Sequence, residues 1–144
     1  DMRKKIIMAC FDGTKNSLRG LDAAIKFAKQ SDATIVGVHS DTSFSAFSAV
    51  RAPLLPEKKW KKKAKALMSI AKKKVEKNKI EFMGIVICGH SSGIDLVTFA
   101  NNPANMIDQI VIGARGLGFP KELFFGSTSN FVLHKAKSPV TIVK

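Results

Sequence analysis

The segment MIDQIVIGARGLGFPKELFFGSTSN, residues 106–130, joins a short apolar run to a glycine-rich stretch and then to the polar start of a helix. The run at 106–113 is continuous and apolar, which is typical of a strand buried on both faces of a parallel sheet. Glycine loses the most backbone freedom on folding, so it is costly unless the chain needs it. The four glycines in this segment therefore indicate either an elaborate turn or a backbone that must come close to another group.

Strand-like and helix-like segments alternate along the rest of the chain. Apolar runs predict four more strands, at 4–11, 33–40, 80–88 and 139–144. Apolar residues at helical spacing predict helices at 16–30, 57–79, 91–102 and about 127–135. Asn16 or Ser17 is the predicted N-cap of the first of these helices. Such alternation implies βαβ units with right-handed crossovers. We therefore expect a single α/β domain over residues 1–144, with an open five-stranded parallel sheet and helices on both faces.

The composition favours a globular domain of the cytoplasm. Hydrophobic residues make up 45% of the chain and charged residues 24%, which is not typical of a disordered protein. No apolar run reaches the roughly 18 residues of a membrane span, and the N-terminal residues lack a signal-peptide cleavage site. Cys10 and Cys88 lie inside apolar runs, which predicts buried, reduced thiols and no disulfide. The Cys and His spacing of a metal site is absent from the sequence.

The net charge of +13 is concentrated in one predicted helix. Residues 57–79 contain eleven lysines and two glutamates, so this segment carries +9 and the rest of the chain about +4. Its apolar residues recur at helical spacing and would face a core: Trp60, Ala64, Leu67, Met68, Ala71 and Val75. The simplest interpretation of the lysines is a solvated helix face. The alternative is a surface that binds nucleic acid or an anionic membrane, although no aromatic residue lies among the lysines to stack on bases.

Ligands of open parallel sheets bind at the carboxyl ends of the strands, near the point where the strand order reverses. The turns to consider are those at 12–14, 39–41 and 89–93, and the glycine-rich stretch. That stretch leads into the N-terminus of the helix at about 127–135, where unpaired N–H groups and a partial positive charge favour phosphate. Ser127 and Thr128 could add hydroxyl donors there. The alternative is that Ser127 only caps the helix and the glycines only form a loop.

The complete glycine pattern, Gly113-x2-Gly116-x9-Gly126-Ser127, resembles the nucleotide-binding signature of the universal stress protein family. Three other segments are similar to that family as well. The residues IIMACFDGTKNSLRGLDAAIKFA (6–28) resemble its opening strand, Asp-Gly-Ser/Thr turn and first helix. IVGVHS (35–40) resembles its second strand, and SPVTIVK (138–144) its closing strand. The resemblance covers nearly the whole chain, is weakest across 41–80, and is strongest to the ATP-binding branch.

The resemblance implies strand order 3-2-1-4-5, with an adenine nucleotide bound between strands one and four. Asp12, helped by Gly113, would accept hydrogen bonds from the ribose hydroxyls, although Asp-Gly is also ordinary turn chemistry. Backbone groups of Ser40 would meet the adenine edge. The residues that would hold the phosphates are Gly116, Gly126, Ser127 and Thr128. The ligand would be ATP or AMP, with any Mg²⁺ carried by the phosphates and no metal ligand supplied by the protein.

Two departures from the family pattern leave the choice between ATP and AMP open. Phe11 is bulkier than the small residue usual before the aspartate and could press on the base or narrow its pocket. Phe119 and Pro120 place a stiff turn within the nine-residue spacer.

The sequence predicts a binding protein of the stress-response or regulatory kind, with at most slow ATP hydrolysis. His39 and His90 lie at strand ends but lack an evident orienting carboxylate, and the Walker A spacing is absent. We expect no catalytic residues. The family resemblance also implies a homodimer, formed through the apolar edge strand at 139–144, which would otherwise be open to uncontrolled pairing.

Overall fold

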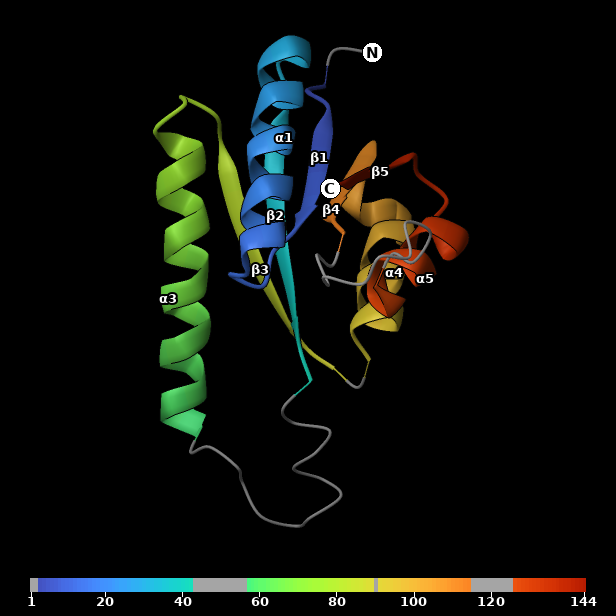
Figure 1. Ribbon diagram of the computed structural model, residues 1–144. Coiled ribbons are helices and arrows are strands. Elements are labelled where there is room, and N and C mark those ends of the chain that lie inside the picture. The colour runs from blue at the N-terminus through green and yellow to red at the C-terminus, as the bar shows by residue number, and fades with distance from the viewer. Residues whose placement is uncertain (1–2, 43–56, 90, 115–125) are drawn as a thin grey trace.

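The computed structural model of the chain describes residues 3–42, 57–89, 91–114 and 126–144 (Figure 1). Its strands are β1 (Ile6–Cys10), β2 (Thr34–Asp41), β3 (Phe82–Cys88), β4 (Gln109–Gly113) and β5 (Val140–Val143). Its helices are α1 (Lys15–Ser31), α3 (Glu57–Glu76), α4 (Ser92–Asn101) and α5 (Ser127–Lys135), with a 3-10 turn η1 (Pro103–Asn105). The five strands pair in parallel in the order β3-β2-β1-β4-β5. The predicted α/β fold with this strand order is confirmed.

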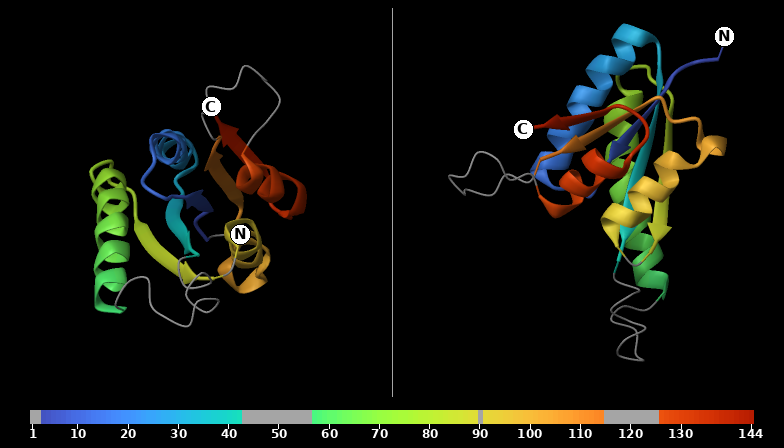
Figure 2. Two further views of the ribbon diagram at one scale, coloured as in Figure 1. Left: turned by 60° about the horizontal axis from the view of Figure 1, so that its bottom comes forward. Right: turned by 90° about the vertical axis from the view of Figure 1, so that its right-hand side faces the viewer.

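Helices cover both faces of the sheet. The helices α1 and α3 lie over one face, and α4 and α5 lie over the other (Figures 1 and 2). Side chains of β1 alternate between two hydrophobic clusters: Ile7, Ala9 and Phe11 belong to the cluster under α1 and α3. Met8 and Cys10 belong to the cluster under α4 and α5. Asp12, two residues after the end of β1, lines a cavity together with Cys10 and Leu96 of this second cluster.

The first helix begins earlier than the sequence indicated. Its N-cap is Thr14, whose hydroxyl accepts a hydrogen bond from the Ser17 amide, so the prediction of Asn16 or Ser17 as N-cap is wrong. The reason lies in the preceding turn, where the Asp12 carboxylate accepts hydrogen bonds from Thr14 and Gly13 adopts a positive φ of 83°. This turn holds Thr14 in an extended conformation and places the other two candidates inside the helix.

The two thiols differ in exposure. Cys10 is buried and Cys88 is exposed, and neither forms a disulfide. The prediction that both thiols are buried is therefore confirmed for Cys10 and wrong for Cys88. Cys88 is the last residue of β3, and β3 forms an edge of the sheet. A residue at the end of an edge strand has neighbours on fewer sides than its apolar sequence context suggests. Within the described ranges, no helix is long and apolar enough to cross a bilayer.

Candidate functional site

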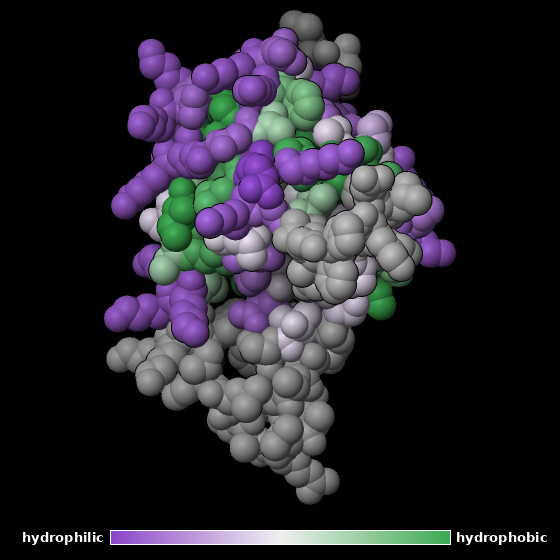
Figure 3. Space-filling view, viewed as in Figure 1, coloured by the Kyte–Doolittle hydropathy of each residue, from purple (hydrophilic) through white to green (hydrophobic). Residues whose placement is uncertain are grey.

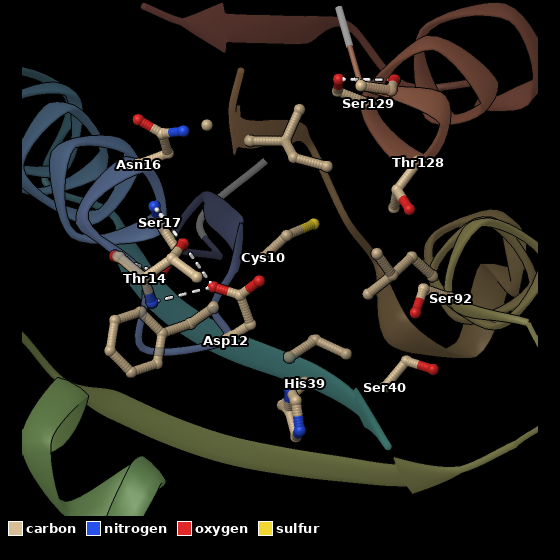
Figure 4. Close-up of a pocket in the computed structure, with 16 residues that line it drawn as sticks. Cys10, Asp12, Thr14, Asn16, Ser17, His39, Ser40, Ser92, Thr128 and Ser129 are labelled. Atoms are coloured by element: carbon tan, nitrogen blue, oxygen red, sulfur yellow. Dashed lines mark hydrogen bonds between the residues drawn. The ribbon is translucent and has the colours of Figure 1, made fainter. Parts of the chain in front are cut away.

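A cavity of about 230 Å³ opens at the carboxyl end of the sheet, where β1 and β4 are neighbours. Its wall is formed by the ends of β1, β2 and β4 and by the N-terminal residues of α1, α4 and α5 (Figure 4). The predicted site residues that line it are Asp12, Ser40, Gly113, Gly126 and Thr128. The sequence-based prediction thus placed residues from four separate segments at one site, and the fold brings them together.

Among the predicted residues that the structure describes, Ser127 does not line this cavity. Ser127 is exposed and borders an adjoining hollow, which shares Ser92 and Thr128 with the main cavity. Gly116 lies outside the described residues, as do Phe119 and Pro120. The role of each residue in contacting a ligand stays a prediction.

The Asp12 carboxylate is held by the turn it sits in. Its Oδ1 accepts from the Thr14 backbone N–H at 3.0 Å and from the Thr14 hydroxyl at 2.6 Å. Figure 4 shows the other carboxylate oxygen directed toward the cavity. Partial burial by itself would raise the pKa of Asp12, but hydrogen bonds from Thr14 and Ser17 and the nearby His39 outweigh it and lower this pKa. Asp12 is therefore an ionised acceptor at neutral pH. One of its carboxylate oxygens accepts the hydrogen bonds of the turn, and the other is directed into the cavity.

The Ser40 side chain is directed toward α4. Its hydroxyl donates to the Asp95 carboxylate at 2.8 Å, which ties the end of β2 to the first turn of α4. The same carboxylate lies directly against Gly89, where a Cβ atom would come within 2.5 Å of Asp95 Oδ1. Sequence reasoning missed Asp95. The spacing Ser92-x-x-Asp95 is a helix-start signature, but nothing local indicates a bond to Ser40.

The structure explains why residue 113 must be glycine, which the sequence alone did not show. A Cβ atom there would lie 2.6 Å from the carbonyl carbon of Asn16 and closer still to its oxygen. A Cβ atom at Gly20, in turn, would lie 3.1 Å from the Gly113 nitrogen. The two glycines let the first half of α1 lie directly on β4, which brings the Asp12 turn next to the end of β4.

The N-termini of two helices meet at the cavity. Gly126 is the N-cap of α5 and Ser91 is the N-cap of α4, and neither provides a side-chain hydrogen bond to the helix. The alternative that Ser127 caps the helix is therefore wrong, since Ser127 is the first helical residue. The first N–H groups of a helix have no partner within it, and they carry a partial positive charge. Two such ends beside Thr128 and Ser92 make this part of the cavity suitable for an anion.

Three further side chains at or near the cavity bear on its chemistry. Phe11 is 2% exposed and packs in the cluster under α1 and α3, and it is also among the residues that line the cavity, so its effect on a bound base stays a prediction. Burial and the Asp12 charge raise the pKa of Cys10 to about 12, which keeps its thiol protonated. Figure 4 shows the His39 ring pointing away from the Asp12 side chain.

The universal stress protein family model matches residues 2–144 of this chain. Universal stress protein YxiE of Bacillus subtilis (strain 168) is 27% identical over 152 residues, which covers 99% of this chain and 100% of that protein. Hypothetical protein MJ0577 has a TM-score of 0.80 at 23% identity, over 97% of this chain and 95% of that one. The universal stress protein of Archaeoglobus fulgidus in complex with dAMP has a TM-score of 0.73 at 23% identity, with both chains fully covered. Because the family model spans nearly all 144 residues, the chain belongs to the universal stress protein family.

Proposed function

We propose that this protein binds an adenine nucleotide, ATP or AMP, in the cavity between β1 and β4 and acts as a regulatory module of the stress response. The observation that carries the proposal is the convergence of the ionised Asp12 carboxylate with the N-termini of α4 and α5 around one cavity. A carboxylate suits a ribose diol, and helix N-termini suit phosphate. Solved members of the family contain dAMP, cAMP and AMP, which supports the class of ligand.

In the proposed complex, the outward oxygen of Asp12 accepts from the ribose hydroxyls. The side chain of Ser40 is already engaged with Asp95, so residue 40 offers the base its main-chain groups only. Phosphate lies at the start of α5, where the first N–H groups and the Thr128 hydroxyl donate to it. The described residues include no group of three or more His, Cys, Asp or Glu side chains that could hold a metal ion, and any Mg²⁺ would arrive on the phosphates.

The same geometry leads us to propose that the protein is not a dedicated hydrolase. Asp12 is engaged in its turn, the Cys10 thiol is protonated and the His39 ring is directed elsewhere. Among the described residues, a bound triphosphate would thus meet no general base that is aimed at a water beside its terminal phosphate.

A calorimetric titration tests the proposal. Protein stripped of nucleotide is titrated with Mg-ATP, with AMP and, as a base control, with Mg-GTP. We expect saturable binding near one adenine nucleotide per chain and much weaker binding of GTP. A folded protein that binds neither ATP nor AMP would overturn the proposed function.

We further propose that the protein is a homodimer formed through β5. This strand pairs with β4 on one side, the described part of the chain places no strand on its other side, and its residues are all partly exposed. An unpaired edge of this kind is a template for another strand. We expect light scattering to give twice the single-chain mass of 15.7 kDa, and a single-chain mass at working concentrations would contradict the dimer.

A further inference from the structure

Most of the net positive charge of the molecule, +10 of +13, belongs to the two helices over one face of the sheet. The helices α1 and α3 contain thirteen basic and three acidic residues, whereas α4 and α5 together contain one Asp, one Lys and one His. Figure 3, viewed toward α1 and α3, shows hydrophilic side chains spread across both helices. We define the basic face by its exposed residues Arg19, Lys26, Lys62, Lys65, Lys73 and Lys77. The sequence located this charge in one helix, and the fold adds α1 to it.

Four of the apolar residues described between positions 67 and 75 of α3 are used by the core of the domain. Ala71 and Val75 are fully buried, and Leu67 and Met68 pack against the same cluster. The lysines consequently occupy the remaining surface of the helix. A 20-residue helix is about 30 Å long, so the charges are spread along a length comparable to the size of the domain.

The acidic side chains described on these helices neutralise little of the basic face. Asp22 lies 2.9 Å from the Lys74 ammonium, and Glu76 lies 3.9 Å from that of Lys72. Both acidic residues are therefore paired with lysines outside the set that defines the basic face. The field of that face extends into solvent over roughly one Debye length, about 8–10 Å at physiological salt.

We propose that the basic face binds the phosphate backbone of double-stranded nucleic acid without reading its sequence. A duplex carries one phosphate charge per about 1.7 Å of its axis, which suits cations spread along two neighbouring helices. None of the large hydrophobic side chains described as exposed is aromatic, so the described part of the face offers no stacking platform of the kind that single strands require. Five of the six residues lie on the exposed surface of α1 and α3, and the sixth, Lys77, directly follows α3.

An anionic membrane is the less suitable partner. A helix that lies in a membrane surface inserts an apolar side about 5–10 Å into the lipid, and the apolar side of α3 is buried on the sheet. Among the described side chains of α1 and α3, Ile70 is the one large hydrophobic side chain that is exposed, at 53%.

The basic face lies on the opposite side of the sheet from α4 and α5 (Figure 2). It is therefore separate from the helix N-termini that are proposed to hold the nucleotide.

The test is the fluorescence anisotropy of a labelled 20-base-pair DNA duplex titrated with the protein at several salt concentrations. With about six phosphate contacts, we expect affinity to fall about a thousandfold between 50 and 200 mM salt. In the variant Lys62→Glu/Lys65→Glu/Lys73→Glu, we expect at least a hundredfold loss at low salt and a shallower salt dependence. Because lysine and glutamate are both good helix formers, the charge reversals should leave the helix folded. The milder variant, in which the same three lysines are replaced by glutamine, should lose part of the affinity.

The matched control reverses three exposed lysines outside α1 and α3, Lys5, Lys135 and Lys137, and changes the net charge by the same amount. This control should keep most of the affinity. Equal losses in the two triple variants would overturn the proposal, because they would indicate a response to net charge alone. Binding to phosphatidylserine vesicles without binding to DNA would also overturn it, in favour of a membrane partner. Nucleotide titration of the same variants should be unchanged, which separates this proposal from the proposed function.

Discussion

Replacing Gly126 with valine is expected to abolish nucleotide binding and to leave the protein folded. Gly126 caps α5 with φ −55° and ψ 157°, a conformation that residues with a side chain adopt readily. Its carbonyl oxygen accepts from the Ser129 hydroxyl and the Asn130 amide, and a new side chain leaves both bonds in place. A branched side chain at this position would instead occupy the wall of the cavity where the helix N-terminus is exposed.

We expect the affinity of the Gly126→Val variant for Mg-ATP to fall at least a hundredfold, which corresponds to about 2.7 kcal/mol. Valine is a poorer N-cap than glycine, so the free energy of unfolding should fall by about 1 kcal/mol. Calorimetry and thermal unfolding measure the two effects separately. Leu133→Val, at a partly exposed position on the same helix, is the control and should bind normally. A folded Gly126→Val protein that keeps its affinity would refute the placement of phosphate at α5.

Among replacements of a strand glycine by alanine, Gly113→Ala is expected to lower the free energy of unfolding the most. The added Cβ atom would overlap the backbone of Asn16, and backbone cannot rotate away as a side chain can. Either α1 must lift from β4 or β4 must shift. Inserting a methyl group into a well-packed interior costs about 1–3 kcal/mol, and overlap with backbone belongs at the upper end of that range.

Thermal unfolding should show a decrease in Tm of about 10 °C for Gly113→Ala. The matched control is Gly84→Ala, also in a strand, where the Cβ atom would lie 3.0 Å from the sulfur of Met68. A methionine side chain is flexible and can adapt, so this variant should unfold within about 2 °C of the unaltered protein. Similar unfolding temperatures for the two variants would contradict the packing argument. Nucleotide affinity should also fall for Gly113→Ala, because the lifted helix carries the Asp12 turn with it.

The candidate site divides into parts that were predictable and parts that were not. Asp12 and Gly126 were identified because they match the motifs of the family that the sequence resembles, and because one stands at the end of a predicted strand and the other before a predicted helix. The bond between Ser40 and Asp95 joins residues 55 positions apart, and no local pattern encodes such a pairing. The N-cap of α1 was misplaced because Thr14 is fixed by its bond to Asp12, while Asn16 and Ser17 looked equally suitable from composition.

The sequence by itself determined the order of strands and helices, the single α/β domain and the position of the glycine-rich turn, because hydrophobic periodicity and glycine placement are local properties. Only the tertiary structure decided what those local features meet. It decided that Gly113 is needed where α1 crosses β4, that Phe11 is buried in the cluster under α1 and α3, and that Cys88 is exposed at the end of an edge strand. It also set α1 beside α3, so that charges far apart in the chain form one face. These outcomes depend on contacts between distant segments, whose free energy is gained only when the whole sheet has assembled.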